Sequence, residues 1–150
     1  MTDLLVILGN QLFPIKYIKK IKPNVVFMKE DLGLCTYEKH HKHKIILFLS
    51  AMRSYRDELK KNKINIKYQE LQLNSRTYTD SLISFIKSKK IDKITFWDIE
   101  DKWFKDEIWK VNKYVKELEM LESPMFLTNK DAFLDMCPAR KRPKYKMTDF

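Results

Sequence analysis

The sequence contains little glycine and little cysteine, with two residues of each among 150. It has neither GxGxxG nor GxxxxGKS/T, so the glycine-rich loops of dinucleotide and nucleoside triphosphate sites are excluded. Cys35 and Cys137 are too few for a disulfide framework, and we expect a reducing, cytoplasmic setting. Apolar runs such as Ile45–Leu49 have five residues, whereas a membrane helix needs about 18. The N-terminus carries Asp3 and no basic segment, which is not typical of a secretory signal.

Positive charge is abundant, because 30 Lys and Arg residues outnumber 20 Asp and Glu residues and give a net charge of +10. Hydrophobic residues make up 44% of the chain, which is enough for a folded core. Within residues 139–150, five basic residues and one acid leave a net charge of +4: Arg140, Lys141, Arg142, Lys144 and Lys146, with Asp149. This run is either an interdomain linker or a contact to nucleic-acid phosphates.

Strand patterns alternate with helix patterns along the chain. Apolar or alternating runs predict strands at 4–9, 24–30, 64–73, 93–100 and 123–129. Helical patterns predict helices at 37–61, 77–90 and 101–120, and a short helix at 15–21. This order predicts an α/β fold, with a doubly wound, mostly parallel, five-stranded Rossmann-like sheet and helices on both faces.

The longest predicted helix carries an apolar stripe at helical spacing, and we expect this stripe to be buried. Its members are His41, Ile45, Phe48, Met52, Tyr55 and Leu59.

Polar residues follow three predicted strands where each one ends, at residues 9–11, 30–31 and 97–100. In an open parallel sheet, ligands bind beyond the carboxyl ends of the strands, so we expect a site there. The amides of Asn10 and Gln11 can bind a flat heterocycle, although Gly9 and Asn10 are equally consistent with a simple turn.

The three histidines lie together as His40, His41 and His43. The spacing of His40 and His43 suits a metal, but three lysines crowd the segment and no further ligand motif occurs, so we expect no metal. Cys35 precedes the histidines without the arrangement of an activated nucleophile, and we expect no catalytic residue.

Three segments carry a resemblance to a known family: ILGNQLFP (7–14), MKE (28–30) and TYEKHHKHKIILFLSAMR (36–53). They resemble the N-terminal region of the photolyase-related proteins, the branch of iron–sulfur bacterial cryptochromes and (6-4) photolyases. Weaker colinear matches follow at KYQEL (67–71), KDAFL (130–134) and RKRPKYKMTDF (140–150). The resemblance therefore covers nearly the whole chain.

The resemblance implies that residues 1–135 form an antenna-chromophore-binding domain, with a ribityl-lumazine as the chromophore. Residues 136–150 would be a basic linker toward a helical domain that holds FAD and an iron–sulfur cluster. Because such a cluster needs four thiolates and the chain has two cysteines, we expect the cluster and FAD only in that other domain. Full-length relatives perform light-driven DNA repair or blue-light sensing, and we expect these 150 residues to be inactive alone.

Carried over position by position, the resemblance implies nine cofactor-binding residues: Gly9, Asn10, Gln11, Glu30, Tyr37, His41, Lys44, Ile45 and Phe48. Independently of the resemblance, the basic run predicts that DNA, if bound, meets Arg140, Lys141, Arg142 and Lys144. Two positions depart from the family pattern, since Asn10 and Leu34 stand where acids are usual. The alternatives are a non-catalytic, basic nucleic-acid-binding module and a small nucleotide-binding enzyme that uses the same sheet edge.

Overall fold

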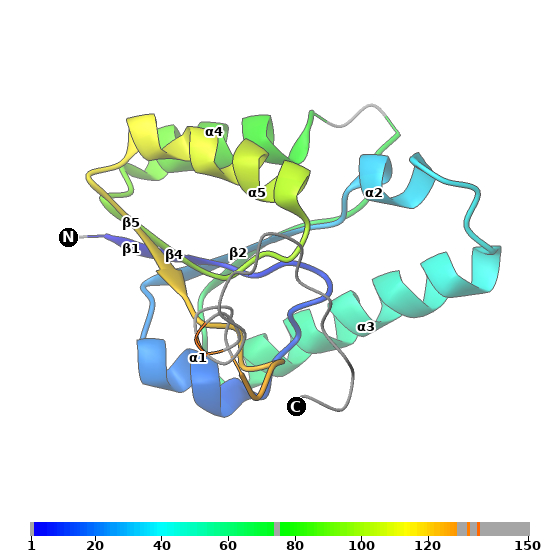
Figure 1. The fold of residues 1–150 in the computed structure, drawn as a ribbon, viewed down its shortest axis with the longest axis horizontal. Helices are drawn as coiled ribbons and strands as arrows, with labels where there is room; N and C mark the ends of the chain where they lie inside the picture. Colours follow the sequence, from blue (N-terminus) through cyan, green and yellow to red (C-terminus); the bar gives the residue numbers. More distant parts are fainter. Residues whose placement is uncertain (1, 74–75, 129–131, 133–134, 136–150) are drawn as a thin grey trace.

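The computed structural model describes residues 2–73, 76–128, 132 and 135, and it contains a five-stranded, entirely parallel sheet (Figure 1). The strand order is β3-β2-β1-β4-β5. The strands are β1 (Asp3–Val6), β2 (Val25–Lys29), β3 (Ile66–Gln69), β4 (Lys93–Trp97) and β5 (Glu117–Leu121). The helices are α1 (Ile15–Ile21), α2 (Leu32–Thr36), α3 (Lys42–Lys61), α4 (Tyr78–Lys89), α5 (Lys102–Trp109) and the 3-10 helix η1 (Lys110–Tyr114). The predicted α/β fold is confirmed.

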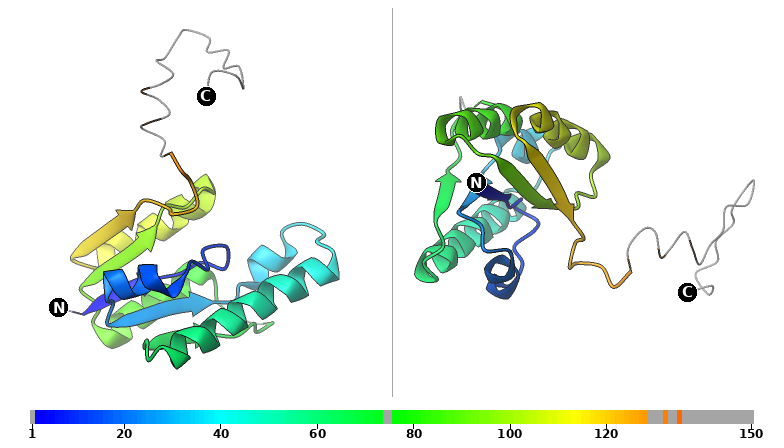
Figure 2. Two further views of the ribbon diagram at one scale, coloured as in Figure 1. Left: turned by 90° about the horizontal axis from the view of Figure 1, so that it is seen from below. Right: turned by 90° about the vertical axis from the view of Figure 1, so that its left-hand side faces the viewer.

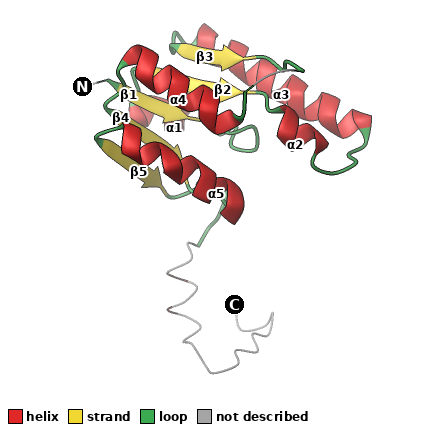
Figure 3. Ribbon diagram, turned by 90° about the horizontal axis from the view of Figure 1, so that it is seen from above, coloured by secondary structure: helices red, strands yellow, loops and turns green. Residues whose placement is uncertain are grey.

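Helices cover both faces of the sheet (Figures 1 and 3), as predicted for a doubly wound sheet. Leu4 and Val6 of β1 pack with α4, α5 and η1, whereas Leu5 and Ile7 pack with α1 and α3. In a strand that is buried on both faces, the side chains on each face meet a hydrophobic core. Residues 4–8 are therefore continuously apolar instead of alternating between apolar and polar. The sheet therefore separates two hydrophobic cores.

The chain reverses its direction across the sheet between β1 and β4. It runs from β1 through β2 to β3 on one side, and β4 and β5 then add on the other side of β1. Ligand sites of open α/β sheets lie at such a switch point, outside the carboxyl ends of the strands.

Helix α4 forms as predicted. The Thr77 hydroxyl accepts a hydrogen bond from the backbone N–H of Asp80 at 3.1 Å, which caps the first turn. Leu82, Phe85 and Ile86 are buried against the sheet. Because helices in this fold begin near the carboxyl ends of the strands, this cap holds the first turn of α4 close to the expected site.

The prediction for the C-terminal part of the sheet is wrong. The fifth strand is Glu117–Leu121 instead of residues 123–129, and the helix predicted at 101–120 ends at Trp109 and continues only as η1. Residues 117–121 pair along the whole length of β4. Lys93 Nζ lies 2.7 Å from Glu117 and 2.9 Å from Glu119, so side-chain pairing also favours the strand.

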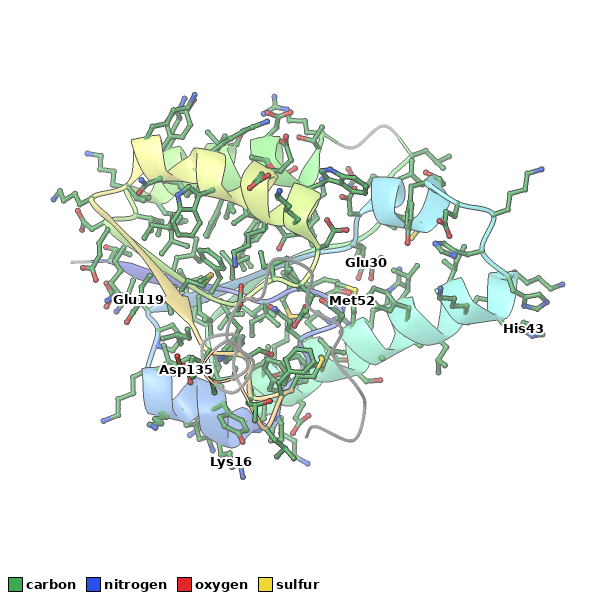
Figure 4. All side chains as sticks on the ribbon, in the orientation of Figure 1. Lys16, Glu30, His43, Met52, Glu119 and Asp135 are labelled. Carbon is green, nitrogen blue, oxygen red and sulfur yellow. The ribbon has the colours of Figure 1, made fainter. Side chains whose placement is uncertain are left out.

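The long helix begins at Lys42 instead of Tyr37, and only part of its stripe is buried. Met52, Tyr55 and Leu59 are buried, whereas His41 is exposed and Phe48 keeps 38% of its surface exposed. The N-terminal half of α3 extends past the ends of the strands (Figures 1 and 2), so no sheet lies beneath it. Figure 4 shows His43 at the far end of this overhang and Met52 close to the sheet.

Two expectations concern residues outside the described part of the chain, namely Cys137 and the basic run at 139–150. Among the residues that are described, no helix is long and apolar enough to cross a membrane.

Candidate functional site

A cavity of about 250 Å³ lies at the carboxyl edge of the sheet, on the switch point. Leu8, Gly9 and Asn10 follow β1 at its floor, and Ile99 and Asp101 follow β4. Its sides come from α2 with the loop behind it, from the overhanging half of α3, and from the first turns of α4 and α5. The cavity thus lies where sequence reasoning expected a ligand site.

The wall formed by α3 is apolar. Ile45, Phe48, Leu49 and Met52 all line the cavity from this helix. Phe104 of α5, which packs on the other face of the sheet from α3, also lines the cavity. An apolar lining from two helices favours a flat, aromatic ligand, because such a ring can bury both of its faces.

Gly9 allows the close approach of α3 to the floor of the cavity. A Cβ atom at this position would lie 2.5 Å from Cε1 of Phe48 and 2.8 Å from Sδ of Met52, well inside van der Waals contact. The backbone of Gly9 does not need a positive φ, so the requirement for glycine comes from packing alone. Gly9 therefore sets the position of the Phe48 ring.

Polar side chains gather on the α2–α3 side of the cavity. Lys44 Nζ lies 3.4 Å from Nδ1 of His40, and the Tyr37 ring meets the His40 ring edge to face at 5.1 Å. Cys35 also lines the cavity. Its burial raises the pKa of its thiol, and the negative charge of the nearby Asp31 raises this pKa further. A thiol held protonated in this way is a poor nucleophile.

Tyr78, the first residue of α4, is 3% exposed and lines the cavity. Its ring makes edge-to-face contacts with Phe27 and Phe104 at centroid distances of 5.8 and 5.4 Å. Its hydroxyl has no hydrogen-bond partner among the described residues. Burial is the main cause that raises the pKa of the phenol well above its usual value, and the negative charge of Asp31 raises it further. The hydroxyl therefore stays protonated.

The family model described as deoxyribodipyrimidine photo-lyase-related protein matches residues 5–150. The chain belongs to this family. No curated protein matches the chain.

Six of the nine residues that the family resemblance singles out line the cavity: Gly9, Asn10, Tyr37, Lys44, Ile45 and Phe48. Residues of two of the three resembling segments, 7–14 and 36–53, thus meet at one site. The other three of the nine residues lie elsewhere. His41 accepts a hydrogen bond from the backbone N–H of His43 at 3.2 Å, and so it caps α3 on the exposed side of the overhang.

Gln11 joins the two loops at the switch point instead of facing the cavity. It is fully buried, and its Nε2 donates to the backbone carbonyl of Asp98 at 2.8 Å. Its Oε1 has no partner within the described part of the chain. We infer that Gln11 fixes the distance between the ends of β1 and β4, which form the floor of the cavity.

Glu30 is fully buried and clamps three segments together. Its carboxylate accepts two hydrogen bonds from Arg53 of α3 at 2.7 and 3.0 Å, one from the Tyr68 hydroxyl at 2.6 Å and one from the Leu71 backbone at 2.8 Å. Burial alone would raise the pKa of Glu30, but these hydrogen bonds outweigh it and hold the pKa below its usual value. All four hydrogen-bond donors belong to this chain, so the Glu30 carboxylate connects parts of the fold.

Lys29 connects β2 to the start of α4. Its buried ammonium donates to the backbone carbonyls of Arg76 and Thr77 and, at 2.9 Å, to the Ser81 hydroxyl. Burial lowers the pKa of this ammonium, although Asp31 and Asp80 act in the opposite direction. The contacts to Arg76 and Thr77 fix the backbone immediately before Tyr78.

Sequence reasoning did not single out Tyr78 or Phe104 as residues of the site. A usable signal exists, because in a parallel α/β sheet the first turn of every helix lies at the same edge as the strand ends. Tyr78 is the residue after the α4 cap Thr77, and Phe104 is the third residue after the α5 cap Asp101, so both lie in the first turn of their helix.

Proposed function

We propose that the cavity binds an antenna chromophore, a planar heterocycle of the ribityl-lumazine class. The protein would then be the antenna domain of a photolyase-related protein of the iron–sulfur and (6-4) branch. The observation that carries this proposal is the cavity at the switch point, with its largely apolar lining. Membership of the photolyase-related family makes a light-absorbing ligand the natural candidate.

The residues present fit such a group. Phe48 and Phe104 can pack against a flat ring. Lys44 and Asn10 are exposed on the rim, where they can bind the hydroxyls of a ribityl chain. A volume of about 250 Å³ is slightly below the range of about 300–1,000 Å³ for small-molecule sites, so it suits the ring with the chain directed outward.

When bound, the chromophore would absorb near-ultraviolet to blue light and pass the excitation energy to FAD. The residues of this chain would bind the ring, orient it and exclude water from it. An antenna transfers energy and does not perform the repair chemistry, so we expect no light-dependent DNA repair from these 150 residues alone. FAD, the iron–sulfur cluster and DNA contacts would belong to the helical domain of the full-length family members.

A matched pair of variants on α3 tests the proposal. Ile45 lines the cavity, whereas its neighbour Ile46 does not and is 58% exposed. An aspartate at either position lies in the first turns of α3, where the helix dipole favours an acid, so both variants should fold. We expect Ile45→Asp to weaken ribityl-lumazine binding about tenfold or more, because a charge would enter the apolar wall.

Binding is measured by fluorescence titration with ribityl-lumazine, and the absorbance spectrum of the purified protein is recorded for a near-ultraviolet to blue band. Ile46→Asp should bind like the wild type. Absence of binding by the wild type would refute the proposal, and equal affinity of the two variants would place the site elsewhere.

A second candidate function is nucleic-acid binding without catalysis, and the charge of residues 139–150 favours it. If these residues contact duplex phosphates, log affinity should fall with log salt by a slope of about 0.9 per phosphate neutralised. The two candidates are compatible, because a contact between residues 139–150 and nucleic acid does not depend on the cavity.

A further inference from the structure

Three lysines surround the start of α3, at the outer end of the overhang (Figures 1 and 4). Lys42 and Lys44 lie in the first turn of the helix, Lys39 lies just before it, and no acid occurs from residue 39 to residue 56. The N-terminus of a helix carries positive partial charge, so acids are favoured there and cations are not. This concentration of positive charge therefore calls for an anion.

The protein itself supplies no such anion within the described ranges. Farther along α3, Arg53 lies 2.7 Å from Glu30 and Arg56 lies 2.9 Å from Glu70. None of the ion pairs between described residues involves a lysine of residues 39–44. The positive charge at the start of α3 is thus left for a solute or a ligand to balance.

Lys44 brings part of this charge to the rim of the cavity, because it is both exposed and part of the lining. Its Nζ lies 3.4 Å from Nδ1 of His40, which also lines the cavity. Lysine offers only donors, so Nδ1 of His40 accepts and its Nε2 keeps a hydrogen to donate. The Tyr37 ring meets the imidazole edge to face at 5.1 Å and helps to hold it. Two donor groups are thereby placed side by side at the rim.

The acids of the cavity do not neutralise Lys44. Asp31 and Asp101 line the cavity, but their carboxylates cap helices, and they accept from the backbone N–H groups of Gly33 at 3.1 Å and Phe104 at 2.9 Å. Neither acid is within ion-pair distance of Lys44. Since about 250 Å³ accommodates the ring with its chain directed outward, the outer end of that chain lies at the rim.

We propose that the ligand of the cavity carries a phosphate ester at the outer end of its chain, and that Lys44 and His40 bind this phosphate at the rim. This inference rests on the proposed function, because it takes the ligand to be a planar heterocycle with a chain that leaves the cavity. It adds the requirement that the chain end in an anion. Phosphate oxygens accept charge-assisted hydrogen bonds, which are stronger than those that a chain hydroxyl forms.

Two pairs of probes that differ only in the phosphate test this proposal. The first pair is ribityl-lumazine and its 5′-phosphate, and the second is riboflavin and riboflavin 5′-phosphate. In fluorescence titrations, we expect the wild type to bind the phosphorylated member of a pair about five- to twentyfold more tightly. This preference should shrink between about 0.05 and 0.5 M salt, because the donors are accessible to solvent.

Lys44→Gln and Lys42→Gln form a matched pair of variants. Both remove one positive charge from the first turn of α3, but Lys44 lines the cavity and Lys42 does not. Each change relieves an unfavourable interaction with the helix dipole, so both variants should unfold at the urea concentration of the wild type or above it. The readout is the affinity ratio within a probe pair, in which effects on the ring cancel. Lys44→Gln should lower this ratio to about twofold or less, His40→Gln should lower it in part, and Lys42→Gln should leave it unchanged.

The outcomes separate this proposal from the proposed function. Equal affinity of the wild type for ribityl-lumazine and its phosphate would overturn the phosphate site and leave the proposed function standing. An equal fall of the ratio in Lys42→Gln and Lys44→Gln would also overturn it, because the preference would then be a diffuse attraction to the basic helix end. Binding of the riboflavin pair alone, with a phosphate preference that Lys44→Gln removes, would support the phosphate site and refute the lumazine assignment. If the wild type bound none of the four probes, both proposals would be overturned.

Discussion

Replacing Glu30 by glutamine tests whether this buried carboxylate holds β2, α3 and the segment after β3 together. The carboxylate accepts four hydrogen bonds, two of them from Arg53. The glutamine side chain has the same shape but replaces one carboxylate oxygen with an NH2 group. This NH2 group is a donor, and it would face N–H or O–H groups that are themselves donors. Hydrogen bonds to a charged group contribute about 1.5–3 kcal/mol each, and the Arg53 side chain is 46% exposed, which weakens its share. We therefore expect Glu30→Gln to lower the free energy of unfolding by about 2–4 kcal/mol.

The assay is urea unfolding at pH 7, followed by far-ultraviolet circular dichroism. With an m-value of about 2 kcal/mol per molar urea, the midpoint should fall by about 1–2 M. Glu70→Gln is the matched control, because Glu70 also pairs with an arginine, Arg56, at 2.9 Å but is 59% exposed. Surface pairs contribute about 0–1 kcal/mol, so the control should stay close to the wild type.

The pH dependence gives a second check, with a definite sign. The folded pKa of Glu30 is lowered, so its contribution is complete above the unfolded pKa of about 4.3 and is lost as the pH falls through the folded value. The stability difference between wild type and Glu30→Gln should therefore be constant from pH 7 to pH 5 and shrink below about pH 4. A difference under about 0.5 kcal/mol at pH 7, or one that persists undiminished at pH 3, would refute the clamp.

Three further predictions concern the cavity and the basic run. Gly9→Ala should displace the Phe48 ring into the cavity and abolish ribityl-lumazine binding, at a cost of about 1–3 kcal/mol in urea unfolding; unchanged binding would contradict the contact. Phe48→Trp should exclude the ligand with little loss of stability, because the ring is 38% exposed; a large loss with normal binding would show that Phe48 is core. Removing residues 139–150 should leave duplex DNA affinity unchanged if the run is a linker, and a weaker, less salt-dependent interaction in gel-shift titrations would instead favour DNA contact.

The sequence predicted correctly those elements whose formation depends on local residue patterns. The apolar run at residues 4–8 and the capped helix at Tyr78–Lys89 need only local information, and both formed as expected. The segment Glu117–Leu121 was predicted as helix because its composition favours helix locally, but pairing with β4 outweighs that preference. Register with a distant strand is a tertiary property that local periodicity does not contain.

The candidate site was likewise predictable only where local sequence patterns determine it. The strand ends and the residues Gly9, Asn10, Tyr37, Lys44, Ile45 and Phe48 were anticipated around one ligand position, and they line one cavity. The structural role of Glu30 could not be anticipated, because its partners Arg53, Tyr68 and Leu71 lie 23, 38 and 41 residues away along the chain. The unpaired state of the Tyr78 hydroxyl is likewise visible only once every neighbouring side chain has a position.

The overhang of α3 gives this helix a gradient of local stability. Met52, Tyr55 and Leu59 anchor its C-terminal half in the core, while the side chains of residues 42–47 are mostly exposed. Helical segments with few buried contacts open at a lower free energy than the global unfolding, so amide hydrogens there exchange faster. A ligand that fills the space between this half-helix and the sheet edge would supply the missing core. Occupancy of the cavity should then be visible as slowed amide exchange confined to one end of a single helix.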